Sequence, residues 1–535
     1  MKLKLLFLGL VSVAFTTVVA QCYTQEESYS ILDSVGKNNA YVVDLAKQAL
    51  LKNPKCSDAY YALGVVYENE QNYRAALDAF SQNIRFASKK SVYSKGQAYV
   101  WRGYVYEEIE DYASAEADYS AAVKQKSMMG YYFRAQFYLR QGDFAAAEKD
   151  FKVYLENKDA NDTEVLSNYV YCLMSQAKLG AALDYLNERI RFEPSFYALY
   201  YERARANFIL AEDVKAIDDL LIYLAHNQGY NDIIWAILEG NTDYSISKIS
   251  ERISVNPKDE YWLWVRMVLY RDSKQFAAAL NDLQIYENLF GENRYTHINK
   301  ALCYNGLYDF SNEVKQWTAL IGDPEANTDF AYYARGIAYR NCGQAERALL
   351  DFDSTLMENP AFSAAYGERA WTYEMLGRLD EALKDINLAI SYSPEKGWLY
   401  CRRGAILRQK GDSVSAQNDF RKVLELDSVS GNAATAMAML GRGDEAVVLM
   451  KNILADSDDF AGDQYNLACL YSLLNRKEEA VAALRAAVDA GYKNFYHISL
   501  DTDLVNIREE QGYKDILNSI TQKKVSDLFQ SVKQK

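Results

Sequence analysis

Residues 332–339 read YYARGIAY, residues 366–373 read YGERAWTY and residues 400–407 read YCRRGAIL. The three stretches begin 34 residues apart. Each has a tyrosine, an arginine three positions later and a small residue directly after that arginine. An alanine follows twelve residues beyond the small residue, and a large apolar residue four positions after the alanine. A fixed period of this kind predicts a stack of similar structural units rather than one large globular core.

The same pattern extends over most of the chain when each unit is numbered from 1 to 34. Position 8 is small, position 20 is alanine and position 24 is large and apolar. Two antiparallel helices approach closely only where the facing side chains are small, so we expect positions 8 and 20 to face each other in a helical hairpin. Proline interrupts a helix, and five prolines fall where a unit ends: Pro54, Pro194, Pro257, Pro360 and Pro394.

This pattern resembles the tetratricopeptide repeat, which has aromatic residues at positions 4, 11 and 24, small residues at 8 and 20, and proline at 32. The resemblance implies an all-α fold, an α–α superhelix of about 12 to 13 helix–turn–helix repeats. It also implies a binding surface rather than a catalyst. We therefore expect a protein without enzymatic activity.

The period divides the chain into parts. We expect the repeat array over residues 57–494, with irregular stretches near 231–259 and 427–445. A degenerate helical unit at 21–56 precedes it, and capping helices with a tail follow at 495–535, because terminal repeats need a polar outer face.

Residues 1–20 have the pattern of a secretory signal peptide. Lys2 and Lys4 precede an apolar run that is too short to span a bilayer comfortably, and small residues end at Ala20. Cys22 raises the alternative of a lipoprotein, which we disfavour because a lipidated cysteine usually follows a small residue and Gln21 is not small. We expect an exported protein of the periplasm or cell envelope, with no other membrane-spanning segment.

Composition narrows the possible partners. The net charge is −14, and nucleic-acid binding needs clustered Lys and Arg, so we expect no nucleic-acid partner. The seven cysteines are odd in number and irregularly spaced, which favours core positions over a disulfide framework.

A charge pair is repeated along the array. Position 7 is arginine and position 23 is aspartate in the same seven units, and units without the arginine lack the aspartate. This co-occurrence predicts an ion pair between the two helices of each hairpin, rather than the alternative of seven arginines lining an anion-binding groove. The pairs are Arg102–Asp118, Arg134–Asp150, Arg203–Asp219, Arg266–Asp282, Arg335–Asp351, Arg369–Asp385 and Arg403–Asp419.

The chain carries no recognisable catalytic or metal-binding motif. It has three widely separated histidines and no HExxH, CxxC, GxSxG or phosphate-binding glycine loop. We predict no catalytic residue, no metal and no cofactor.

One surface is left for a ligand. In the tetratricopeptide family, first-helix positions 2, 5, 9 and 12 line a concave surface, called here the first-helix face. Tyr, Trp and Arg, which are enriched at interface hot spots, recur on it. We expect it to bind a protein or extended peptide, as a scaffold or assembly factor; the alternative is a carbohydrate, because aromatic faces also stack on sugars. The candidates are Tyr132, Tyr171, Tyr201, Arg205, Trp264, Arg271, Tyr333, Arg340, Trp371, Trp398 and Arg408.

Overall fold

The computed structural model describes residues 38–88, 91, 93–157, 162–323 and 326–520. The expected signal peptide at 1–20, Cys22 and the tail from residue 521 lie outside these residues. All regular secondary structure in the described part of the chain is helical, so the predicted all-α repeat fold is confirmed.

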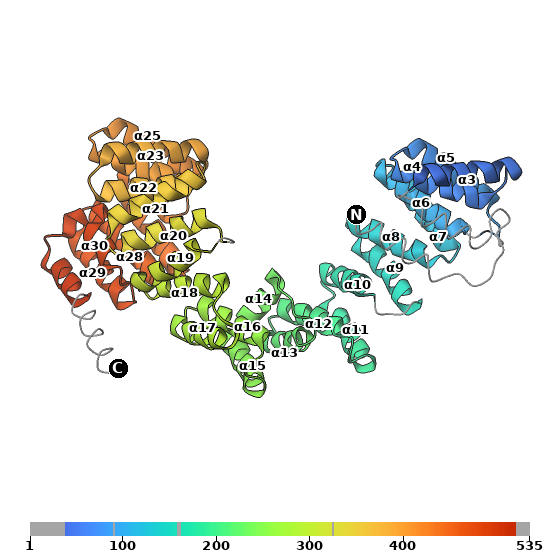
Figure 1. Ribbon diagram of the computed structural model, residues 1–535, viewed down its shortest axis with the longest axis horizontal. Coiled ribbons are helices and arrows are strands. Elements are labelled where there is room, and N and C mark those ends of the chain that lie inside the picture. Colours follow the sequence, from blue (N-terminus) through green and yellow to red (C-terminus); the bar gives the residue numbers. More distant parts are fainter. Residues whose placement is uncertain (1–37, 89–90, 92, 158–161, 324–325, 521–535) are drawn as a thin grey trace. The chain divides into compact units, whose positions relative to one another are not determined.

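The chain forms two compact units, residues 1–245 (unit 1) and 246–535 (unit 2). Within each unit the helices pack in sequence order as antiparallel hairpins (Figure 1). Unit 1 contains α3 (Asn39–Lys52), α4 (Ser57–Asn69), α5 (Tyr73–Phe86), α6 (Lys95–Glu108), α7 (Tyr112–Lys124), α8 (Met128–Arg140), α9 (Phe144–Asn157), α10 (Thr163–Ser175), α11 (Leu179–Phe192), α12 (Ala198–Ile209), α13 (Asp213–Leu224) and α14 (Asp232–Gly240).

Helix α15 (Thr242–Val255) contains the boundary between the units. Unit 2 continues with α16 (Glu260–Asp272), α17 (Phe276–Phe290), α18 (Arg294–Gly306), α19 (Phe310–Ile321), α20 (Thr328–Asn341), α21 (Ala345–Glu358), α22 (Ser363–Met375), α23 (Leu379–Tyr392), α24 (Gly397–Gln409), α25 (Ser413–Leu426), α26 (Gly431–Met439), α27 (Gly443–Ala455), α28 (Phe460–Leu473), α29 (Lys477–Asp489), α30 (Phe495–Leu500) and the 3₁₀ helix η1 (Thr502–Ile507).

Each hairpin from α4 to α29 except α14–α15 turns through one residue with positive φ, two positions after the last residue of its first helix; this conformation ends an α-helix and suits glycine best. Glycine fills this turn in five hairpins, for example Gly377 at φ +72°. The turn residues in chain order are Gln71, Glu110, Gly142, Ala177, Ala211, Lys274, Tyr308, Gly343, Gly377, Gly411, Gly441 and Asn475.

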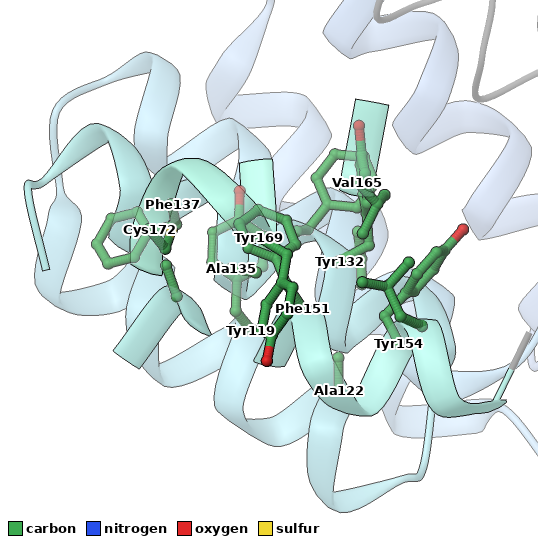
Figure 2. Packing of buried hydrophobic residues seen from close by; sticks show 14 of the residues in the cluster. Tyr119, Ala122, Tyr132, Ala135, Phe137, Phe151, Tyr154, Val165, Tyr169 and Cys172 are labelled. Carbon is green, nitrogen blue, oxygen red and sulfur yellow. The ribbon is translucent and has the colours of Figure 1, made fainter. Parts of the chain in front are cut away.

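Small residues let the two helices of a hairpin meet. A Cβ atom added at Gly336 would lie 2.8 Å from the ring of Phe352, and Ala348 is fully buried beside them. The core of unit 1 has the same composition, with Tyr119 and Phe151 fully buried between alanines (Figure 2). The repeated small and large positions are therefore packing positions.

Two first helices are short. α14 and α26 have nine residues each, whereas the first helices of the regular hairpins have at least twelve. α14 is joined to α15 by a single residue, Asn241, so this hairpin lacks the turn that the other hairpins share. Beyond η1, residues 511–520 form a further helix.

Candidate functional site

The repeated arginines are bound within the fold. Each of the seven donates one hydrogen bond from Nε and one from Nη2 to the two carboxylate oxygens of the aspartate sixteen residues later, at 2.6–2.9 Å. The pair is largely shielded from solvent: the Asp351 side chain is 7% exposed and that of Arg335 15%. These bidentate pairs join the two helices of one hairpin.

The third guanidinium nitrogen of each arginine joins neighbouring repeats. Nη1 of Arg403 donates to Asn387 at 2.8 Å, and Asn387 lies on the second helix of the preceding hairpin. These acceptors were not predicted from the sequence. Most of them lie directly after the large residue at position 24, in units whose following unit carries the arginine, and this pattern could have identified them. The acceptors are Ser81, Ser120, Asn187, Ser250, Thr318, Asp353 and Asn387.

Tyrosines of the same helix cover these arginines. The guanidinium of Arg335 lies 5.5 Å from the ring centroids of both Tyr332 and Tyr339, three residues before it and four after it. Cation–π contacts of this kind occupy the remaining faces of the guanidinium group. The ladder of arginines therefore serves cohesion between helices and leaves no anion-binding groove.

In unit 1 the candidate ligand residues differ in accessibility. Tyr132 was expected on the first-helix face, but it is 5% exposed, because it packs against Tyr154 of α9 (Figure 2) and its hydroxyl donates to Glu164 of the next hairpin at 3.2 Å. Tyr171 is 44% exposed, and Tyr201 is half-buried with its hydroxyl near Asn231.

The remaining unit 1 candidate, Arg205, donates to Glu202 at 2.7 Å and lies 5.9 Å from the ring of Tyr201. Glu202 is buried, so this arginine is held against the helix surface.

Three candidates of unit 2 are half-buried or already bound. Trp264 meets the edges of Tyr286 and Tyr295, and Arg271 binds Asp272 and Asn299. Tyr333 packs among Phe330, Phe352 and Phe362, and burial raises the pKa of its hydroxyl to about 12.

Trp371 is covered on both sides. The guanidinium carbons of Arg340 and Arg402 lie 3.9 and 4.4 Å from its ring, and Arg340 also binds Glu368. Arg402 donates to the buried Glu374 at 3.2 Å. Trp371 and Arg340 were expected to contact a ligand; Trp371 lines a cavity of unit 2, and Arg340 lies between the Trp371 ring and Glu368.

A cavity of about 370 Å³ lies on the first-helix face of unit 2. Trp398 and Arg408 from α24 line it, together with Asn432 of α26 and Asn466 of α28. Arg408 is exposed, and its positive charge lies near the carboxylate of Asp503. These are the polar and aromatic groups of unit 2 best placed to meet a ligand.

The C-terminal elements form the remaining wall of this cavity. The cavity is also lined by His497 of α30, by Asp501 at the N-cap of η1 and by Asp503 of η1, none of which was predicted as a site residue. The repeat pattern ends before them, so only the folded chain brings them to α24. The carboxylate of Asp501 accepts a 2.6 Å hydrogen bond from the hydroxyl of Tyr465.

Burial changes the protonation of these groups. Burial raises the pKa of Asp503 to about 7, assisted by the nearby Asp501 and opposed by Arg402. Burial lowers the pKa of His497, which favours the neutral imidazole. Burial also raises the pKa of the Cys401 thiol, on the cavity wall, to about 12, so this thiol is protonated and unreactive in the folded state.

Within the described ranges, no group of three or more His, Cys, Asp or Glu side chains is arranged to hold a metal ion. No helix in the same ranges has the length and apolar character needed to cross a bilayer. Cys172, Cys303, Cys401 and Cys469 are buried free thiols, whereas the buried Cys56 is disulfide-bonded.

These features define an α-helical repeat protein. Its repeated Arg–Asp pairs stabilise the stack of hairpins, and the side chains that can meet a ligand lie on the first helices. Models of the tetratricopeptide repeat match residues 43–91, 102–162 and 333–395, and residues 399–429 and 464–490. The chain therefore contains tetratricopeptide repeats, as its period predicts. Such repeats typically serve as protein-interaction modules.

Relatives share these repeats over part of their length. The chain is 29% identical to tetratricopeptide repeat protein 13 of Homo sapiens over 198 residues, which are 34% of this chain and 22% of that protein. It is 33% identical to tetratricopeptide repeat protein 36 of Danio rerio over 98 residues, 18% of this chain and 52% of the relative. The chain thus spans about a fifth of the length of the human relative and about half the length of the Danio rerio relative.

Solved structures are also similar. Yeast Tom70 has 15% sequence identity and a TM-score of 0.37, with 81% of this chain and 96% of that chain covered. A tetratricopeptide repeat protein from Parabacteroides merdae has 17% identity and a TM-score of 0.30, with 53% and 99% covered.

Proposed function

We propose that this protein is a non-catalytic scaffold or assembly factor that binds a protein or extended peptide on its first-helix face. The observation that carries the proposal is the cavity around Trp398 and Arg408. Aromatic and arginine side chains at a concave site are the groups that dominate protein interfaces, because they bury much area and form directed contacts.

The remaining contacts of unit 2 support this choice of site. The four Arg–Asp pairs of unit 2 occupy its repeated charges, and the guanidinium groups of Arg340 and Arg402 lie against the ring of Trp371. Trp398 and Arg408 line the same cavity as Trp371, and Arg408 is exposed there. In unit 1 the exposed Tyr171 offers a second contact point.

A peptide array tests the proposal. The full chain is applied to an array of random twelve-residue peptides, and the strongest peptides are titrated by fluorescence anisotropy against the wild type, Arg408→Ala and Trp398→Ala. We expect each substitution to weaken binding on the order of tenfold, as for an interface hot spot. Leu350→Ala, at an exposed position of the second helix α21, is the matched control and keeps the wild-type affinity.

Equal affinity of Arg408→Ala, Trp398→Ala and the control would place the peptide elsewhere and would contradict the proposal. A glycan array run in parallel tests whether the ligand is a carbohydrate. Saturable binding of glycans, with no peptide binding, would replace the peptide by a sugar as the ligand.

We also propose that the protein is exported, through the signal sequence expected at residues 1–20. The disulfide at Cys56 supports export, because disulfides persist in oxidising compartments. N-terminal sequencing of the mature protein is expected to find Gln21 as the first residue. A blocked, lipid-bearing N-terminus at Cys22 would instead establish a lipoprotein.

A further inference from the structure

The C-terminal segment of unit 2 crosses to the first-helix face of repeats that lie more than a hundred residues earlier. The ring of Tyr492 lies 5.7 Å from that of Tyr308, and His497 lies 5.3 Å from Trp371. The hydroxyl of Thr502 donates to Glu374 at 3.5 Å. These contacts bring the red C-terminal elements beside the yellow helices of unit 2 (Figure 1).

One further contact is a close approach of backbone and ring. Gly343 forms the turn between α20 and α21, and a Cβ atom there would lie 2.5 Å from the ring of Tyr496. We call this set of contacts the seam: Tyr308, Gly343, Trp371 and Glu374 on one side, and Tyr492, Tyr496, His497 and Thr502 on the other. Lys274, in the turn after α16, also donates a hydrogen bond to the backbone carbonyl of Asp458 across a similar span of sequence.

The two sides of the C-terminal segment are held differently. Ile498, Leu504 and Ile507 are fully buried in the core formed with α28 and α29, and Tyr513 donates to the Ile498 carbonyl at 2.9 Å. The side that faces the seam presents ring edges, one long hydrogen bond, and the carboxylates of Asp501 and Asp503 near the Arg402 guanidinium. The apolar side therefore fixes the segment to α28 and α29, while aromatic and polar contacts join its other side to the seam.

The seam also borders the cavity. His497 and Asp501, on the same segment, form one wall of the cavity that contains Trp398 and Arg408. We propose that unit 2 closes on itself at the seam, and that a partner segment reaches this cavity only after the seam opens. This closure is an autoinhibitory contact built into the fold, and it rests on the function proposed above, since it regulates the same surface.

Two buried cysteines make the opening measurable. Cys401 and Cys469 line the cavity, and Cys469 lies 3.7 Å from the Asp501 carboxylate behind the seam. Burial holds the pKa of both thiols above the usual range, so they react slowly while the seam is closed. Cys172 and Cys303 are buried in hairpin cores away from the cavity and serve as internal references.

The experiment compares two glycine substitutions in the full chain. Gly343→Ala and Gly377→Ala occupy the same turn in successive repeats and have similar backbone strain, at φ +77° and +72°. A Cβ atom at Gly377 has no neighbour within 4 Å, whereas at Gly343 it collides with Tyr496. The rate of maleimide labelling of each cysteine is measured by mass spectrometry under native conditions.

We expect Gly343→Ala to speed the labelling of Cys401 and Cys469 on the order of tenfold relative to Gly377→Ala, with Cys172 and Cys303 unchanged. Tyr496→Ala, which removes the ring without straining the backbone, is expected to have the same effect. Equal rates at Cys401 and Cys469 in all variants, or a parallel rise at Cys172 and Cys303, would overturn the closure. Because no partner is added, this outcome is independent of whether the peptide array succeeds.

Discussion

At the scale of the residue, the repeated arginine does more than pair with its aspartate. Arg369 holds Asp385 in its own hairpin and Asp353 in the preceding one, while Tyr366 covers the guanidinium. The sequence predicts the first of these contacts because Arg and Asp occur in the same units. It leaves the second undetected, because the partner lies on a different repeat and its residue type varies among Ser, Thr, Asn and Asp.

The burial of these pairs sets the cost of breaking one. Asp351→Ala leaves the Arg335 guanidinium largely buried without its carboxylate, and we expect a loss of about 3–5 kcal/mol in the free energy of unfolding. Chemical denaturation followed by circular dichroism measures it. Arg378→Ala removes an exposed pair with Glu381 and is expected to change the free energy of unfolding far less. Similar losses for both variants would show that the repeated pairs are not buried in solution.

Glu313 makes the stability of unit 2 depend on pH. It is buried in α19, where it accepts hydrogen bonds from Asn305 and Trp317, and burial raises its pKa to about 7 from an ordinary 4.5. Below pH 4.5 the folded and unfolded chains both hold the proton. Between pH 4.5 and 7 the unfolded chain loses it first, so the stability contributed by the protonated folded state is lost as the pH rises.

Glu313→Gln removes this titration. We expect the variant to gain stability relative to the wild type between pH 4.5 and pH 8, by on the order of 3 kcal/mol. Thermal melts at the two pH values measure the difference. A constant difference between the variant and the wild type across this range would contradict the raised pKa.

At the scale of the element, each hairpin depends on the fit between a small residue and a ring. The glycines at position 8 face rings at position 24: Gly64 meets Phe80, Gly103 meets Tyr119, and Gly404 meets Phe420. Where position 8 is Ala370, the facing residue is the smaller Ile386, and both are fully buried. Alanine is also accommodated opposite a ring, since Ala135 and Phe151 are both fully buried, so position 8 requires a small residue rather than glycine alone.

Gly336→Ala tests this fit. Its Cβ atom would lie 2.8 Å from the Phe352 ring, so we expect overpacking to lower the free energy of unfolding by about 1–3 kcal/mol despite the better helix propensity of alanine. Gly180→Ala, in α11 with nothing within 4 Å, is the matched control and is expected to gain about 0.5–1 kcal/mol. Stabilisation by both substitutions would exclude a tight contact at position 8.

At the scale of the whole molecule, the chain is an array in which most contacts join neighbouring elements and which divides into two compact units. Repeat arrays of this kind lose cooperativity as they lengthen, since each unit gains stability mainly from its neighbours. We expect scanning calorimetry of the full chain to resolve two transitions. Asp150→Ala, in unit 1, is expected to lower one transition temperature, and Asp385→Ala, in unit 2, the other. A single transition that both substitutions lower equally would show that the two units unfold together.

The sequence by itself determined the repeat, the helical hairpin and the pairing of Arg335 with Asp351 and its six equivalents. All of these are local: they recur at a fixed spacing, so one unit predicts the next. The turn at Gly377 and the close packing at Gly336 follow from the same spacing.

Only the tertiary structure decided which aromatic and charged side chains of the first-helix face remain accessible to a ligand. Tyr132 is buried by its neighbour, and Trp371 is covered by Arg340 and Arg402, although both tyrosine and tryptophan occupy positions that the repeat assigns to the ligand surface. His497 meets Trp371 across more than a hundred residues of sequence. A 34-residue period carries no information about such a contact, because it arises where the stack of unit 2 returns to its own earlier repeats.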